Sequence, residues 1–169
     1  DPEVVRFFIL TAHYRSPVDF SDQNLKEARA GLSRFYEALQ AADDAVEGVP
    51  ESQVVAHEGV ELEAQFRAAM DDDFNTAQAI GHLFEGVRTI NRMIAEKKFR
   101  KKADKVAAVR ALHAKLLAEY PALVDKVKVT LITEEGEVER LAGGFTDAGP
   151  RVADVGAVLF PHGLRVAGA

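Results

Sequence analysis

Apolar residues recur every three or four positions between residues 77 and 94, and this spacing is the strongest constraint on the fold of the chain. The stripe consists of Ala77, Ile80, Leu83, Phe84, Val87, Ile90, Met93 and Ile94. This spacing places all of them on one side of an α-helix, since the helix completes a turn every ~3.6 residues. A helix with so continuous an apolar face is stable when other elements cover that face. The segment therefore predicts a helix packed among other helices.

The first half of the chain predicts two more helices. Residues 3–12 are almost entirely apolar and predict a short buried helix. Ser21 is suited to cap a longer helix that starts at Asp22. Its apolar face consists of Leu25, Ala28, Leu32, Phe35, Tyr36 and Leu39. Residues 43–59 are acidic and include glycine and proline, so they predict a mobile loop.

Two further helices are expected at about residues 60–70 and 104–119. The inner face of the second consists of Val106, Val109, Leu112, Leu116 and Leu117. We expect this helix to stop before Pro121, since proline lacks the amide hydrogen that continues a helix. Short connections between such helices favour antiparallel packing. The chain is thus predicted to be mainly α, an antiparallel bundle of four to five helices.

The pattern changes after residue 120. Apolar and polar residues alternate over 127–131 and again over 137–141, with a turn sequence at 133–136, which predicts a β-hairpin. Residues 152–160 and 164–166 add candidate short strands. We therefore divide the chain into a helical bundle, residues 1–120, and a small β-rich or mixed carboxy-terminal domain, residues 121–169. The second part is too small to hold a core of its own and is expected to lean on the bundle.

Three consecutive aspartates, Asp71, Asp72 and Asp73, precede Phe74 and Asn75 between two predicted helices. Clustered carboxylates suit a divalent cation, but loops that bind hard cations alternate their ligands around a glycine turn. The contiguous run instead predicts a structural helix start. In that interpretation Asp73 or Asn75 caps the next helix, the carboxylates favour the positive end of its dipole, and Phe74 enters the core.

Composition and spacing predict neither catalytic residues nor a metal site. The chain has no cysteine, which excludes a thiolate nucleophile, a cysteine zinc site and a disulfide. The histidines, His13, His57, His82, His113 and His162, lie far apart without metal-binding spacing. There is no glycine-rich phosphate loop and no serine nucleophile motif.

The sequence also sets an expectation about location. No apolar run reaches the ~18 residues that a membrane-spanning helix needs, and no secretory leader opens the chain, so we expect a cytoplasmic protein with no membrane partner. Because the sequence begins at Asp1 without methionine, we expect it to be a piece of a longer protein.

A basic cluster stands out against the net charge of −6. Its cations, all within residues 97–105, are Lys97, Lys98, Arg100, Lys101, Lys102 and Lys105. A local concentration of cations can bind a phosphate backbone even on an acidic protein, because the affinity comes from release of counterions. The alternative is a solvated helix end, where cations favour the negative end of the dipole.

Two segments resemble the carboxy-terminal part of cysteinyl-tRNA synthetases. They are RFFILTAHYRSPVDFS (residues 6–21) and AMDDDFNT (residues 69–76), and the likeness extends over about residues 1–95. The resemblance implies a helical bundle that braces the inner side of tRNA and belongs to the same parent chain as a catalytic domain. It also implies that ATP and zinc are bound by that catalytic half, so no cofactor is expected in this chain.

The expected RNA contacts follow from the resemblance and the charges together. The basic cluster would contact phosphates, and Tyr14 and Arg15 would add stacking or hydrogen bonds. The tail lacks the family's final tryptophan, and the chain has no tryptophan at all. Candidates for base recognition in the tail are Arg140, Arg151, Phe160, His162 and Arg165.

Two alternatives belong to other functional classes. The mycothiol-pathway cysteine ligases resemble the same synthetases but join cysteine to an amino sugar, and would need no basic patch. A bundle that binds another protein would carry an exposed apolar patch and would not respond to RNA. Binding of tRNA that weakens steeply with salt separates the first interpretation from both.

Overall fold

The computed structural model describes residues 1–50, 54 and 56–124, and beyond them the backbone of four strands. The helical part consists of α1 (Pro2–Leu10), α2 (Asp22–Val46), α3 (Glu58–Asp71), α4 (Thr76–Ile94), the short 3₁₀ helix η1 (Phe99–Lys101) and α5 (Ala103–Val124). Asp1 caps α1, Ser21 caps α2 and Asn75 caps α4, each through a side-chain oxygen that accepts a backbone N–H. These caps fix where the helices begin.

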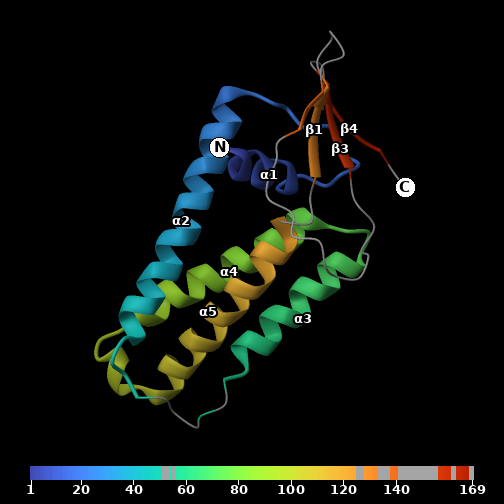
Figure 1. Cartoon of the computed structure of the whole chain (residues 1–169). Helices are drawn as coiled ribbons and strands as arrows, with labels where there is room; N and C mark the ends of the chain where they lie inside the picture. Colours follow the sequence, from blue (N-terminus) through green and yellow to red (C-terminus); the bar gives the residue numbers. More distant parts are fainter. Residues whose placement is uncertain are drawn as a thin grey trace.

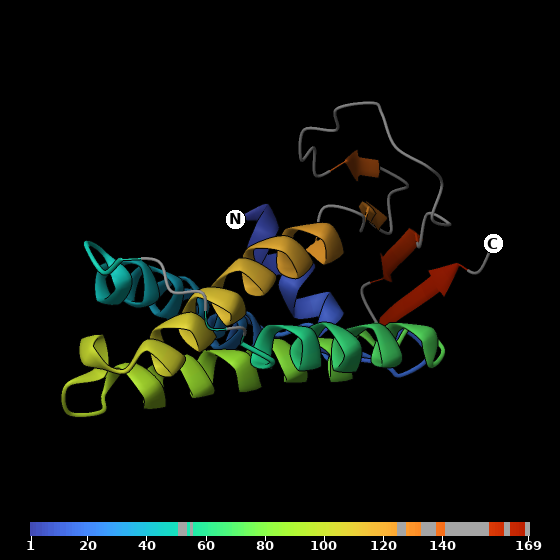
Figure 2. The ribbon, with the colours of Figure 1, turned by 90° about the horizontal axis from the view of Figure 1, so that it is seen from below.

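The four long helices run alternately in opposite directions, which confirms the predicted antiparallel bundle (Figure 1). Helices α3, α4 and α5 pack against one another, and α2 packs on α4 and α5. The short helix α1 crosses one end of α2 (Figures 1 and 2). Each interior helix therefore has its apolar stripe covered by at least two neighbours.

Four aromatic rings from four different helices form the centre of the core. The ring centroid of Phe35 lies 4.7 Å from that of Tyr120 and 5.8 Å from that of Phe84. Phe7 completes the group at 6.1 Å from Phe84 and 6.4 Å from Tyr120. These distances suit tilted aromatic contacts, which add to the gain from burial. The Tyr120 hydroxyl donates to Oε1 of Glu3 at 3.1 Å, so its polar end is satisfied.

Helix α5 continues through Pro121 to Val124, so the expected stop before the proline is wrong. A proline inside a helix costs about 3 kcal/mol, because it removes one hydrogen bond and crowds the preceding turn. The last turn, however, buries Tyr120, Leu123 and Val124. Since each buried side chain of this kind contributes about 1.5–3 kcal/mol, packing outweighs the cost of the proline.

Two residues assigned to inner faces are exposed instead. Leu117 of α5 is 50% exposed and Tyr36 of α2 is 46% exposed. The hydroxyl of Tyr36 donates to Oε1 of Glu3 at 2.6 Å, so this residue lies at the margin of the core. The other predicted members of both stripes are buried or partly buried.

The loop expected over residues 43–59 is shorter than predicted, because α2 extends to Val46 and α3 begins at Glu58. Gly59 lies inside α3 at a close approach to α5. A Cβ atom at this position would lie 3.0 Å from the carbonyl oxygen of Ala111. The glycine therefore allows two helices to approach closely, and does not mark a loop.

Beyond α5 the described backbone forms a sheet of β1 (Lys128–Ile132), β2 (Val138–Arg140), β3 (Gly156–Phe160) and β4 (Gly163–Ala167), in the order β2-β1-β3-β4. β1 is antiparallel to β2 and parallel to β3, and β3 is antiparallel to β4. Arg140, Phe160 and Arg165 take backbone positions in these strands, whereas Arg151 and His162 lie outside the described residues. The division of the chain at residue 120 stays a prediction.

Candidate nucleic-acid interface

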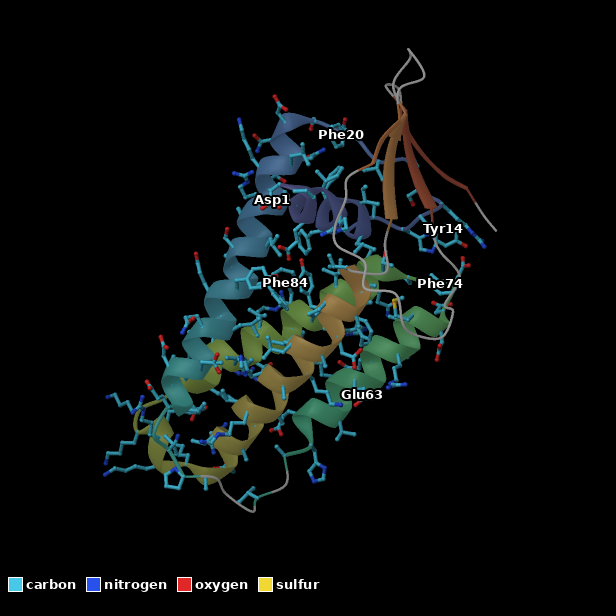
Figure 3. All side chains as sticks on the ribbon, viewed as in Figure 1. Asp1, Tyr14, Phe20, Glu63, Phe74 and Phe84 are labelled. Carbon is cyan, nitrogen blue, oxygen red and sulfur yellow. The ribbon has the colours of Figure 1, made fainter. Side chains whose placement is uncertain are left out.

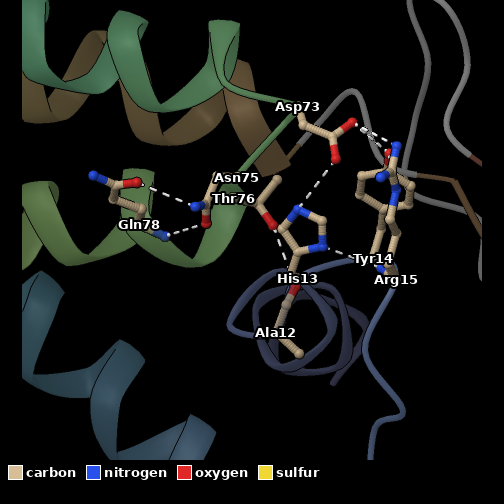
Figure 4. A network of polar contacts seen from close by, with 8 residues as sticks. All are labelled: Ala12, His13, Tyr14, Arg15, Asp73, Asn75, Thr76 and Gln78. Atoms are coloured by element: carbon tan, nitrogen blue, oxygen red, sulfur yellow. Dashed lines mark hydrogen bonds and ion pairs between the residues drawn. The ribbon is translucent and has the colours of Figure 1, made fainter.

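The residues predicted to contact RNA fall into two groups at opposite ends of α4. Tyr14 and Arg15 lie near its first residue, Thr76 (Figure 4), and the basic cluster follows its last residue, Ile94 (Figure 1). A helix of 19 residues spans about 28 Å at 1.5 Å per residue. The structure therefore separates the two groups by roughly the length of this helix.

The connection between α4 and α5, residues 95–102, is called here the lysine turn. Phe99 is only 5% exposed and anchors the turn in the core. The backbone is closed by short-range hydrogen bonds, from Phe99 N to the Glu96 carbonyl at 3.1 Å and from Lys101 N to the Lys98 carbonyl at 2.9 Å. The turn is thus a defined scaffold for its cations.

Half of the cations in the basic cluster already have partners within the protein. Lys102 Nζ lies 2.6 Å from Oε2 of Glu96, and Lys105 Nζ lies 3.2 Å from Oε1 of the same residue. Arg100 Nη2 donates to the backbone carbonyl of Asp44 at 2.7 Å. The hydrogen bond from Lys102, followed by that from Lys105, holds the pKa of the Glu96 carboxyl below its usual value.

The other half is exposed. Within the part of the chain that the structure describes, the side chains of Lys97, Lys98 and Lys101 have no hydrogen bond or ion pair, and all three residues are exposed. Three positive charges within five residues therefore face solvent at one end of the bundle, where they can bind phosphate oxygens.

At the other end of α4, Asp73 joins the segment after α1 to the turn between α3 and α4 (Figure 4). Its Oδ1 accepts from the Tyr14 hydroxyl at 2.6 Å and from Arg15 Nη2 at 3.0 Å. Arg15 Nε donates in turn to the Tyr14 oxygen at 2.8 Å, and the ring of His13 stacks on Tyr14. We call these four residues the Asp73 junction.

The junction explains one pKa shift and limits the role of its members. The hydrogen bond to the Asp73 carboxylate is the main cause that raises the pKa of Tyr14 above its ordinary value. The Arg15 side chain remains 66% exposed, so it has donors left for another acceptor. RNA binding by Tyr14 and Arg15 stays a prediction. The sequence did not indicate that Asp73 is their partner, although the segments 6–21 and 69–76 that contain the three residues were both singled out.

The aspartate run lies where α3 ends and the turn to α4 begins, and its details differ from the prediction. Asn75 caps α4, since its Oδ1 accepts from Gln78 N at 3.1 Å, whereas Asp73 bonds to the Tyr14 and Arg15 side chains. Asp71 is the last residue of α3, and Asp72 follows as its C-cap. Phe74 does not enter the core: it is 44% exposed, with a left-handed backbone at φ 51°.

A second carboxylate with two cationic partners lies on α3. Glu63 pairs with Lys115 of α5 and with Arg67 Nη2 at 2.8 Å. The hydrogen bonds from Lys115 and then Arg67 keep the pKa of Glu63 below its usual value. Glu63 thus resembles Glu96 in chemistry, but it lies within helix α3 and not in the lysine turn (Figure 3).

The described residues offer neither a metal site nor a membrane-spanning helix. They contain no group of three or more histidine or acidic side chains that could hold a metal ion. Their helices include none that is both long enough and apolar enough to cross a membrane.

Comparisons with known proteins relate this chain to one group of proteins. Residues 65–119 match the DALR domain family. The chain is 67% identical over 117 residues to the cysteine–tRNA ligase of Syntrophotalea carbinolica, a match that covers 69% of this chain and 24% of that protein. The chain is related to the carboxy-terminal region of cysteinyl-tRNA synthetases. The resemblance stated from two sequence motifs is thereby confirmed.

A longer alignment extends the relationship to the synthetases. The chain is 46% identical over 158 residues to the cysteine–tRNA ligase of Geobacter sulfurreducens, covering 83% of this chain and 32% of that protein. The chain thus spans about a quarter to a third of the length of these synthetase relatives. The DALR match begins within α3 and ends within α5, so it contains both the Asp71–Asn75 turn and the lysine turn.

Proposed function

We propose that this chain is the tRNA-binding part of a cysteine–tRNA ligase and that it positions the RNA without catalysing a reaction itself. The observation that carries the proposal is the lysine turn, whose exposed cations lie inside the DALR match. A ligase that attaches cysteine to tRNA must hold a polyanion much larger than its active site. A rigid bundle with cations at one end suits that task.

The charge distribution favours a local contact with the RNA backbone. With a net charge of −6, the chain as a whole repels a polyanion. The lysine turn offsets this locally, because each lysine that pairs with a phosphate releases counterions. We therefore expect binding that is tight only at low salt, and that orients the RNA without reading its sequence.

The Asp73 junction is a second candidate contact. The exposed guanidinium of Arg15 can donate to a phosphate or stack on a base while Asp73 fixes its position. Contacts at both ends of α4 would hold an RNA at two points about 28 Å apart. Two separated contacts fix orientation better than one.

The remaining expectations about the whole protein belong to the same proposal. A catalytic domain of the same parent chain would carry the ATP and zinc sites, and this chain would carry no cofactor. A cytoplasmic location goes with this role. None of these features is needed for the RNA contact itself.

The test measures binding of the chain to total tRNA and to a cysteine-accepting transcript. Fluorescence anisotropy gives the affinity at about 50 and 200 mM salt. We expect binding to both RNAs that weakens steeply with salt. A preference for the cysteine transcript would show that the chain also reads identity. Absence of binding at low salt would contradict the proposal and leave the cysteine ligase without RNA, or a protein-binding bundle, as the function to test.

A further inference from the structure

The cations between residues 97 and 105 divide into two groups by their partners. We propose that Lys97, Lys98 and Lys101 form the RNA phosphate contact, and that Glu96 keeps Lys102 and Lys105 out of it. This inference rests on the proposed function and refines it. The residue that limits the number of phosphate contacts is the acidic residue Glu96. Glu96 is then a positioning residue that sets how many phosphates the turn neutralises.

The three free lysines are presented by the backbone of the turn. Lys98 has a left-handed conformation with φ 61°, and it starts the η1 helix. Phe99, next in the chain, is buried, so Lys98 is held outside as its neighbour turns inward. Lys101 N donates to the Lys98 carbonyl, which brings Lys98 and Lys101 to the same short turn. Because the backbone of the turn is already ordered, little backbone entropy is lost when these side chains bind a phosphate.

The two held lysines use both oxygens of Glu96. Lys102 is bound through Oε2 and Lys105 through Oε1, so each cation has its own acceptor. The side chains of all three residues are less than half exposed, at 42%, 33% and 31% for Lys102, Lys105 and Glu96. A phosphate from RNA would have to displace the Glu96 carboxylate, which already lies 2.6 Å from Lys102 Nζ and 3.2 Å from Lys105 Nζ.

Arg100 also has a partner within the protein, so it belongs with the paired cations Lys102 and Lys105. Its Nη2 donates to the Asp44 carbonyl at 2.7 Å, which ties the lysine turn to the last turns of α2. Lys102 and Lys105 tie the end of α4 to the start of α5 through Glu96. The paired cations thus hold the turn against three helices, and the unpaired ones face outward.

The decisive experiment is the salt dependence of tRNA binding for the wild-type chain and for Glu96→Gln. Each phosphate contact contributes about 0.7 to 0.9 to the slope of log K against log salt. The three contacts at the lysine turn predict an affinity loss of about 20- to 40-fold between 50 and 200 mM salt, and a phosphate contact of Arg15 would multiply this loss by about 3 in every variant. Glu96→Gln releases two further lysines, and five contacts predict a loss of about 130- to 500-fold.

Glu63→Gln is the matched control, because it removes the same charge and also frees two cations, but on α3 and α5. Its salt slope should equal that of the wild-type chain. The triple variant E96Q/K102Q/K105Q removes the released lysines and should return the slope to the wild-type value. Circular dichroism of each variant checks that the helices are intact.

The outcomes separate this inference from the proposed function. A wild-type chain that binds tRNA with an unchanged slope in Glu96→Gln overturns the inference alone, as does an equal increase in Glu63→Gln. A wild-type slope that already corresponds to five or six contacts also overturns it. If neither the wild-type chain nor Glu96→Gln binds tRNA at 50 mM salt, the proposed function fails and the inference with it.

Discussion

Phe74 occupies a position that its own chemistry disfavours. Its backbone is left-handed at φ 51°, next to Asp73 at φ 56°, and its ring is 44% exposed. A side chain with a Cβ atom pays about 1–2 kcal/mol in this conformation. The hydrogen bonds from Phe74 N to the Met70 carbonyl and from Asn75 N to the Ala69 carbonyl hold it there. The sharp turn is what brings Asp73 within reach of Tyr14 and Arg15.

We predict that Phe74→Gly is more stable than Phe74→Ala by about 0.5–1 kcal/mol, because glycine adopts a positive φ without strain but loses more entropy on folding. Both variants remove the same exposed ring, so their difference isolates the backbone. Urea unfolding followed by circular dichroism measures it. Equal stability of the two would mean that the left-handed conformation costs no more than the extra entropy that glycine loses on folding.

Single residues were the hardest part to predict from the sequence. Of the two caps predicted for α4, Asn75 is the one observed, but the roles of Asp73 and Phe74 depend on a left-handed turn that no local pattern announces. Asp73 is bound by Tyr14 and Arg15, which lie about 58 residues earlier in the chain. Such a pairing is set by tertiary packing and is visible only once helices α1, α3 and α4 are in place.

At the scale of elements, the cap of α4 is separable from the Asp73 junction. Asn75→Ala should destabilise the fold by about 1 kcal/mol, because the Gln78 amide loses its acceptor. Thermal unfolding measures the loss, and addition of magnesium should leave both the wild-type chain and the variant unchanged. A stabilisation by magnesium that disappears in Asn75→Ala would instead mean that the turn binds a cation.

The ion pairs of Glu96 with Lys102 and Lys105, between the end of α4 and the start of α5, predict that stability depends on pH. Lys102 and Lys105 lower the pKa of Glu96 from its ordinary value of 4.5, so the folded state favours the ionised carboxylate. The unfolded state then binds the proton more readily, and the stabilisation is complete above pH 4.5 and lost as the pH falls to the lowered pKa. Stability should decline on acidification more in the wild-type chain than in Glu96→Gln.

Urea unfolding between about pH 3 and 6 measures this difference. In a K102Q/K105Q background, Glu96→Gln should no longer change the pH dependence, because the partners that shift the pKa are gone. A difference that persists in this background would assign the effect to other carboxylates.

Helix positions were predicted well where a stripe was long, and poorly at helix ends. The stripe of α4 is confirmed, and so is the cap at Ser21. The ends of α2, α3 and α5 were misplaced because Gly59 and Pro121 are usual signals of loops. In this fold Gly59 serves a close contact with Ala111, and the turn with Pro121 is kept by burial of Tyr120, Leu123 and Val124.

At the scale of the whole molecule, the aromatic group unites four helices. Phe35 is 1% exposed and contacts Phe84 and Tyr120. Phe35→Ala should cost about 3–5 kcal/mol, since it removes a large buried ring and leaves a cavity. Phe35→Leu fills most of that space and should cost less. Chemical unfolding of both variants tests the ranking, and a small loss in Phe35→Ala would mean that the helices collapse into the gap.

The surroundings of Tyr120 within this aromatic group also affect the pKa of its phenol. Burial, and next the Glu3 carboxylate, raise the pKa of Tyr120 far above its ordinary value, so the phenol stays protonated in the folded bundle. Its hydrogen bond to Glu3 ties the end of α5 to the start of α1. The architecture was predictable because it follows from apolar spacing, whereas this polar contact at the margin of the core was not.

The lysine turn and the Asp73 junction lie at opposite ends of the stiff helix α4. A small rotation at one end therefore becomes a large displacement at the other. Over about 28 Å, a tilt of the bundle by about 10° around the junction moves the lysine turn by about 5 Å. That displacement exceeds the length of a hydrogen bond, so it would break the contacts with phosphate that we propose for the three lysines. The accuracy of the contact at one end is therefore decided by how firmly the other end is seated.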